Sequence, residues 1–129
     1  MQDGQQPAAD NPRDLLLAAD VARLSHHSGQ AVTPLRRLLA SFPGDPRAPL
    51  AAFTLGRVLL DELGRPREAA EAFARARSGA MAEDALAREV EAWSRAGDSA
   101  TARTRAELYL QLYPKGRRDR SVRRYGGLE

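Results

Sequence analysis

Adjacent titratable residues at three places in the sequence are the first candidates for chemistry. They are His26-His27, Asp61-Glu62 and Glu83-Asp84. Neighbouring residues on a helix point about 100° apart, so the two histidines rarely reach one ion, and no acidic cluster beside them completes a ligand set. Catalysis by paired carboxylates needs two acids that face each other across a cleft with separated pKa values. We therefore expect polar turn residues and helix-capping acids, with no catalytic residue and no metal site.

Residue types and spacing exclude several other kinds of site. The chain has no cysteine, which rules out disulfides, thiolate zinc sites and cysteine nucleophiles. Serines are few, and none lies in a strand–turn–helix elbow of the kind that exposes a nucleophile. The glycines are isolated and form no phosphate-binding loop. The sequence therefore predicts no enzyme and no bound cofactor.

The composition indicates a small helical protein. The 129 residues are 43% hydrophobic, 29% charged and only 5% aromatic, so one domain or a few stacked units must be built mainly from Leu and Ala, which favour helices. The longest apolar runs, such as residues 15–19, are far shorter than the roughly 20 residues of a membrane helix. Residues 1–11 are polar and do not resemble a signal peptide. We expect no membrane span.

Positive charge is concentrated near the end of the chain. The net charge is +3 and the isoelectric point about 9.9, but residues 115–124 hold six basic residues and one acidic residue, so the remainder is slightly acidic. The basic residues are Lys115, Arg117, Arg118, Arg120, Arg123 and Arg124. They indicate either a phosphate, anionic-lipid or nucleic-acid patch, or a polar helix that caps the end of a helical stack. Because only Tyr125 is available for stacking on bases, nucleic-acid binding is the alternative function.

Helix-breaking residues recur at regular spacing along the chain. Apolar residues at 3- and 4-residue intervals predict helices at about 13–25, 31–41, 48–63, 67–77, 82–95, 100–112 and 117–125. Gly29, Gly64 and Gly97 fall between paired helices at separations of 35 and 33 residues, and Pro43 and Pro114 end pairs 71 residues apart. A period near 34 predicts an all-α solenoid of three antiparallel helix pairs.

The expected domain organisation follows from these breaks. Residues 1–12 are predicted to be a flexible arm, residues 13–125 a helical repeat domain, and residues 126–129 a tail. The repeat domain divides into units of about 13–46, 47–80 and 81–114, with a capping helix at 117–125. Leu and Ala layers are expected to form the core, with Phe73 and Trp93 as its large side chains.

The second unit resembles a tetratricopeptide repeat (TPR). It carries Ala52, Leu55, Gly56, Leu59, Gly64, Ala69, Phe73 and Ala76 in the order of that family's signature. Ala52 and Leu59 stand where the family has larger or aromatic residues, and one extra residue precedes Gly64. The third unit keeps Trp93 at an aromatic position but has Ala106 in place of Phe, and the first unit matches weakly. The resemblance implies a TPR-like α-α superhelix that binds proteins and is not an enzyme.

In that family, the first helix of each pair lines a concave groove in which peptides bind. Carried onto this sequence, its outward positions are Arg13, Asp20, Arg23, Phe53, Arg57, Asp61, Asp84, Glu91 and Arg95. The mixture of arginines and carboxylates could hold a peptide by charge-assisted hydrogen bonds. The alternative is a solvated face with internal ion pairs, each contributing about 0–1 kcal/mol. Phe53 is the aromatic residue among these outward positions, and its exposure would be the most informative observation, because an exposed aromatic in a groove is a typical anchor.

The endings of two units indicate a cellular setting. Phe42-Pro43 and Tyr113-Pro114, in an Ala- and Arg-rich chain with a single lysine, are similar to bacterial cell-envelope repeats. Examples are the TolA-binding periplasmic protein, the outer-membrane assembly lipoprotein and the repeat domains of FecR-like regulators. The resemblance implies a periplasmic or envelope-associated scaffold whose partner is another protein or peptide. A cytoplasmic location and simple self-association are the alternatives.

Overall fold

The regular elements of the protein are helices joined by short turns. The computed structural model describes residues 11–129, and these contain no β-strand. The long helices are α1 (Pro12–Leu24), α2 (Val32–Ser41), α3 (Ala48–Arg57), α4 (Pro66–Ala74), α5 (Ala82–Arg95), α6 (Ser99–Leu112) and α7 (Asp119–Tyr125). The short turns η2 (Ser28–Ala31) and η4 (Gly79–Met81) are 3₁₀, and η3 (Val58–Glu62) is π-helical. The all-α prediction is confirmed for residues 11–129.

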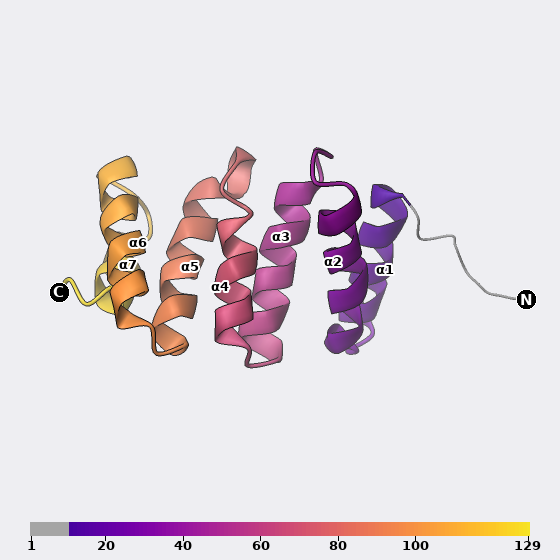
Figure 1. The fold of residues 1–129 in the computed structure, drawn as a ribbon, viewed down its shortest axis with the longest axis horizontal. Coiled ribbons are helices and arrows are strands. Elements are labelled where there is room, and N and C mark those ends of the chain that lie inside the picture. Colours follow the sequence, from indigo (N-terminus) through magenta and orange to yellow (C-terminus); the bar gives the residue numbers. More distant parts are fainter. Residues whose placement is uncertain (1–10) are drawn as a thin grey trace, which may run out of the picture.

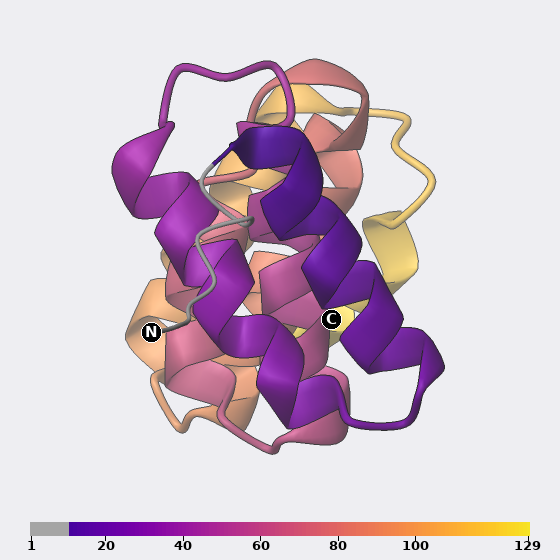
Figure 2. The same ribbon diagram turned by 90° about the vertical axis from the view of Figure 1, so that its right-hand side faces the viewer.

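Consecutive helices stand side by side in one row along the long axis of the molecule (Figure 1). The turns between consecutive helices lie alternately above and below the row in Figure 1, so neighbouring helices run antiparallel. Figure 2 looks along the row from its amino-terminal side and shows α1 and α2 next to each other in front of the rest. The last helix, α7, packs against both α5 and α6. None of the described helices is long and apolar enough to cross a membrane.

Local chemistry explains where the helices begin and end. The side chain of Asn11 accepts a hydrogen bond from the backbone N–H of Asp14 at 2.9 Å, and Pro12 occupies the first turn of α1. Asp98 caps α6 in the same way through Thr101. Residues 11 and 12 of the predicted arm therefore belong to the cap and start of α1, and residues 1–10 lie outside the described part.

The turn after α1 lies where it was predicted, at residues 26–29, but its left-handed residue is a histidine. Gly64 and Gly97 have φ angles of +63° and +82° where predicted helices end, a conformation that favours glycine. In the first unit, however, His26 adopts the left-handed conformation, with φ of +61°, whereas Gly29 lies in the 3₁₀ turn η2. The chain therefore reverses direction at His26, within the turn that separates α1 from η2.

Two clusters of buried side chains form the core, and α5 contributes to both. The larger cluster joins α1 to α4 and receives Ala85 and Ala92 from α5. The smaller cluster joins Leu86 and Val90 of α5 to α6 and α7. Small alanines on one face of α5 and branched residues on the other allow neighbouring helices to approach from both sides.

The prediction of the large core residues is half right. Phe73 is fully buried, as expected, but Trp93 is only partly buried at the edge of the larger cluster. Its indole N–H donates to Glu89 at 2.9 Å, and the guanidinium of Arg67 lies 5.3 Å from its ring centroid, so polar partners hold it near the surface. Tyr109 of α6 is the large, fully buried side chain of the third unit.

The contact between α3 and α4 is unusually close because it uses a glycine. A Cβ atom added to Gly56 would lie 2.6 Å from the ring carbons of Phe73, so only glycine fits opposite this ring. Downstream, the backbone N–H of Leu63 donates to the carbonyl of Val58 at 3.1 Å, which closes the π-helical turn η3. The extra residue before Gly64 is absorbed in this turn, so α4 still packs on α3.

Candidate functional site

Four charged side chains of α5 lie on one face of the helix. They are Asp84, Arg88, Glu91 and Arg95, and we call them the α5 stripe. Their spacing of three to four residues places them one above another along the helix. The stripe includes three predicted groove residues and one, Arg88, that the prediction missed.

Arg88 joins the stripe to α3. Its guanidinium nitrogen Nη2 lies 2.7 and 2.6 Å from the two carboxylate oxygens of Asp61, which belongs to the π-helical turn η3. Nη1 of Arg88 donates to Glu91 at 2.8 Å, and Glu91 also pairs with Arg95 at 2.7 Å. Glu91 is only 8% exposed, so two arginines balance the one carboxylate that the stripe buries.

The other side of the stripe contacts the segment that leads into α7. Asp84 lies 3.2 Å from Arg117 and 3.1 Å from Arg118. At the far end, a hydrogen bond with Tyr125 and the charge of Glu91 raise the pKa of Arg95 above its ordinary value. One set of ion pairs thus joins η3 to α5, and a second joins α5 to the segment before α7. We call the surface that carries both sets the α3–α5–α7 face.

The predicted groove residues divide into two groups. The structure brings Asp61, Asp84, Glu91 and Arg95 together on the α3–α5–α7 face. The groove residues of α1 pair only within that helix, Asp20 with Arg23 at 3.2 Å and Arg13 with Asp14 at 3.6 Å. Arg57 is exposed one turn before Asp61 and has no ion-pair partner among the described residues.

The expectation for Phe53 is wrong. Its side chain is 8% exposed, and its ring meets Phe73 edge to face with centroids 5.5 Å apart. Because α3 is packed on several sides by its neighbours, the position that faces outward in the predicted repeat is covered here. Phe53 is a core residue and offers no aromatic anchor for a peptide.

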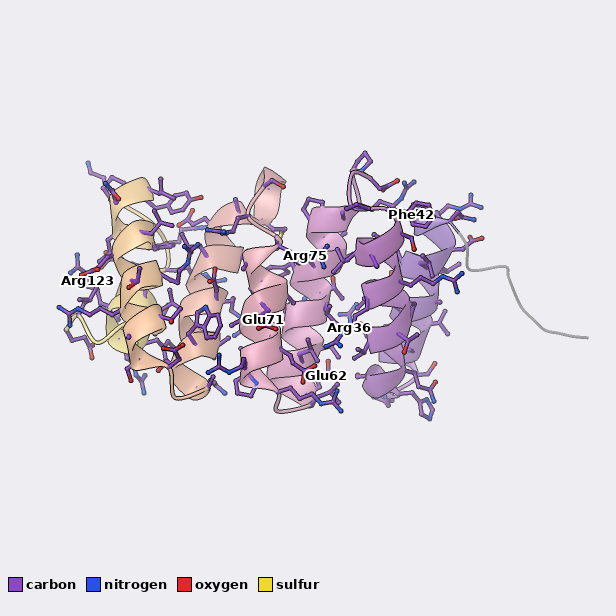
Figure 3. The ribbon with its side chains drawn as sticks, viewed as in Figure 1. Arg36, Phe42, Glu62, Glu71, Arg75 and Arg123 are labelled. Atoms are coloured by element: carbon purple, nitrogen blue, oxygen red, sulfur yellow. The ribbon has the colours of Figure 1, made fainter. Side chains whose placement is uncertain are left out.

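The basic residues of 115–124 are partly neutralised by neighbouring acids. Besides Arg117 and Arg118, which bind Asp84, Arg123 pairs with Asp119 at 3.0 Å, and Figure 3 shows Arg123 at the α7 end of the row. Lys115 and Arg120 have no ion-pair partner in the described part of the chain, and Arg124 lies over the ring of Tyr125 at 5.8 Å. The positive charge that no acidic side chain of the described residues balances therefore belongs to Lys115, Arg120 and Arg124.

A buried tyrosine fixes the loop before α7. The hydroxyl of Tyr109 donates to Glu83 at 2.7 Å and accepts from the backbone N–H of Arg118 at 2.9 Å. Glu83 also accepts from the backbone N–H of Arg117 at 2.9 Å. Burial and the hydrogen bond with Glu83 raise the pKa of Tyr109 to about 12, so it remains a phenol donor. A Cβ at Gly116 would collide with this hydroxyl and with Glu83.

A second charged surface lies between α2 and α4. Arg36 of α2 forms an ion pair with Glu68 at 2.5 Å, and Arg75 donates to the backbone carbonyl of Leu39 at 3.1 Å. With Glu71 they line a shallow pocket between the two helices (Figure 3). These contacts join α4 to α2. The α3–α5–α7 face has the larger set of connected charges, because Asp61, Arg88, Glu91 and Arg95 form consecutive ion pairs.

The carboxylates of Asp61-Glu62 and Glu83-Asp84 are engaged by neighbouring side chains and backbone groups. Glu83 binds Tyr109 and the loop before α7, Asp61 binds Arg88, and Glu62 accepts a hydrogen bond from Ser28. No three His, Cys, Asp or Glu side chains within residues 11–129 are placed to hold a metal ion. No family model, curated protein or solved structure matches the chain. Its function is therefore inferred from its own residues.

Proposed function

We propose that the protein is a non-enzymatic interaction module that binds a segment of another protein across the α3–α5–α7 face. Its helix pairs would form a TPR-like superhelix, with α7 standing where the first helix of a fourth unit would stand. The close approach at Gly56 and Phe73 supports this arrangement, as do the full burial of Ala69 and Ala76 and the packing of α7 on α5.

The observation that carries the proposal is that one face of α5 holds two sets of ion pairs. The first joins Asp61, Arg88, Glu91 and Arg95, and the second joins Asp84 to Arg117 and Arg118. These side chains are held in place by one another yet remain open to solvent: the side chains of Asp61, Arg95 and Arg118 are 45%, 51% and 49% exposed. Pre-ordered charged groups lose little conformational entropy when they bind a peptide. They can also exchange a partner within the face for a backbone or side-chain group of the ligand.

The wider setting is proposed from the resemblance alone. A periplasmic or envelope-associated scaffold in a bacterial cell-envelope complex is the setting that Phe42-Pro43 and Tyr113-Pro114 favour, with the cytoplasm as the alternative. Nucleic-acid binding through residues 115–124 is the second candidate function. It is favoured by the exposed arginines of α7 and disfavoured by the acids that pair with Arg117, Arg118 and Arg123.

Paired variants of the full chain test the proposed face. Proteins captured with the wild-type chain are identified and bound again, as purified proteins, to wild type and to Arg57→Ala/Arg95→Ala. We expect at least about fivefold weaker binding for this variant, roughly 1 kcal/mol. The matched control, Arg47→Ala/Arg65→Ala, removes the same charge from exposed positions away from the face and should bind like wild type. Equal binding by both variants would contradict the proposal.

A further inference from the structure

The helix α7 carries a pocket whose walls are mostly arginine. Arg117, Arg118, Arg120 and Arg124 line it together with Ser121 and Tyr125. Arg120 and Arg124 stand one turn apart on α7 and are exposed, and neither is paired with a carboxylate in the described structure. The pocket therefore presents positive charge that the protein itself leaves unbalanced.

One wall of this pocket is fixed before any ligand arrives. The backbone N–H groups of Arg117 and Arg118 are held by Glu83 and Tyr109, and both guanidinium groups are directed by Asp84. A pocket ordered in advance binds more tightly than a flexible basic tail, because fewer side-chain conformations are lost on binding.

The shape and charge of the pocket fit carboxylates. Guanidinium groups bind a carboxylate through two parallel N–H···O bonds, whereas the hydroxyl of Ser121 already donates to the backbone carbonyl of Arg118. Glu129 also lines the pocket, which places a carboxylate near these arginines although it forms no ion pair with them in the described structure. A ligand would have to compete with this residue.

The surroundings favour a short acidic segment over a nucleic acid. A nucleic-acid strand needs positive charge along a path and aromatic rings for its bases. Here the uncompensated arginines sit on one helix, Glu83 and Asp84 lie next to the pocket, and Tyr125 is already engaged by Arg95 and Arg124. The pocket is also continuous with the α3–α5–α7 face through Asp84.

We infer that the α7 pocket binds aspartate or glutamate side chains of the partner protein, so that the partner carries an acidic segment. This inference rests on the proposed function, because it names the chemistry of the partner at one end of the same face. The pocket would fix the direction of the bound segment by holding its acidic part next to α7.

The test uses the full chain and fluorescence anisotropy at about 50 and 200 mM salt. The probes are a labelled peptide with a run of glutamates between Gly-Ser flanks, its glutamine counterpart, and a labelled oligothymidine of equal charge. We expect the glutamate peptide to bind, the glutamine peptide not to bind, and Arg120→Ala/Arg124→Ala to weaken binding about tenfold. The control Arg47→Ala/Arg65→Ala should bind like wild type, and Glu129→Gln should bind about twofold more tightly.

Each contrary result has a distinct meaning. Absence of binding of the glutamate peptide, or equal binding by Arg120→Ala/Arg124→Ala and wild type, overturns the α7 pocket as an acidic-segment site. Tighter binding of oligothymidine that is lost in the same variant overturns the choice of a protein ligand. The proposed function is judged separately, by the captured partner and Arg57→Ala/Arg95→Ala, so the pocket can fail while the α3–α5–α7 face is retained.

Discussion

At the scale of single residues, Gly56 is a position where close packing against Phe73 leaves no room for a side chain. Alanine at a helical glycine ordinarily stabilises by about 1 kcal/mol. Here the added Cβ would meet the Phe73 ring at 2.6 Å, and this ring is fully buried and cannot move aside. We expect Gly56→Ala to lower the free energy of unfolding by a net 1–2 kcal/mol, roughly, because overpacking outweighs helix propensity.

Chemical unfolding followed by circular dichroism measures this change. Gly44→Ala is the control, since no atom lies within 4 Å of a Cβ at that position, and it should leave stability within about 0.5 kcal/mol of wild type. In a Phe73→Leu background the same Gly56→Ala change should cost less, because the smaller side chain can yield. An equal cost in both backgrounds would show that the ring is not the cause.

Glu89 is a buried carboxyl group whose charged form is destabilised by its surroundings. Burial raises its pKa above the ordinary value of 4.5, opposed by the hydrogen bond from Trp93 and the charge of Arg77. Nε of Arg105 lies 3.1 Å from one carboxylate oxygen, while the other oxygen has no hydrogen-bond partner among the described residues. The ionised carboxylate is therefore only partly compensated.

The pH dependence of Glu89→Gln tests this description. A raised pKa in the folded state means that protonated Glu89 stabilises the fold fully below about pH 4.5, the unfolded value. That contribution is lost as pH rises through the higher folded pKa. Glutamine cannot ionise, so the stability of wild type relative to the variant should fall across this window and then level off above the folded-state pKa. A difference that stays constant from pH 4 to 8, about the accessible range, would contradict the raised pKa.

At the scale of elements, the attachment of α7 depends on one hydroxyl. Tyr109→Phe removes the group that joins Glu83 to the backbone of Arg118 and leaves that N–H without its partner. We expect a loss of about 1–3 kcal/mol and faster amide hydrogen exchange in residues 117–125, with α1 to α4 unchanged. Tyr113→Phe is the control, because the hydroxyl of Tyr113 makes no hydrogen bond within the described residues. Equal amide exchange in residues 117–125 of both variants would show that the Tyr109 hydroxyl does not hold this segment in place.

The helices were predictable from local signals, and the exceptions have physical causes. Glycine and proline breaks and apolar spacing predicted every long helix, because these depend on backbone conformation near each residue. The first turn was predicted at residues 26–29, but its left-handed residue, His26, could not be singled out because this conformation is uncommon for a histidine. The π-helical turn η3 was visible in the sequence only as one extra residue before Gly64.

The candidate site was less predictable because it depends on contacts between units. Arg88 shares the α5 stripe with Asp84 and Glu91, so helical spacing alone could have found it. Nothing local indicates that Asp61 reaches Arg88, which lies 27 residues further along the chain. The burial of Phe53 could have been predicted, because residues 51–56 have no charged side chain, and a helix that is apolar all round is buried.

At the scale of the whole molecule, α5 contributes buried side chains to both core clusters of the described residues. In a stacked helical protein each unit contacts its neighbours alone, so stability is a sum of units and interfaces, and one end can unfold while the other persists. Leu86 belongs to the cluster of α5, α6 and α7, whereas Leu35 belongs to the cluster of α1 to α4. Both side chains are almost fully buried, at 2% and 0% exposure.

Leu86→Ala and Leu35→Ala should therefore weaken opposite ends of the molecule. Each truncation costs about 2–5 kcal/mol, but native-state hydrogen exchange should show the loss in α6 and α7 for Leu86→Ala and in α1 and α2 for Leu35→Ala. Trp93 packs on the larger cluster, so its fluorescence should keep its native value while α6 and α7 open in Leu86→Ala. If either variant raised exchange equally in all seven described helices, the clusters would unfold as one cooperative unit, and binding at α7 could not be separated from the stability of α1 to α4.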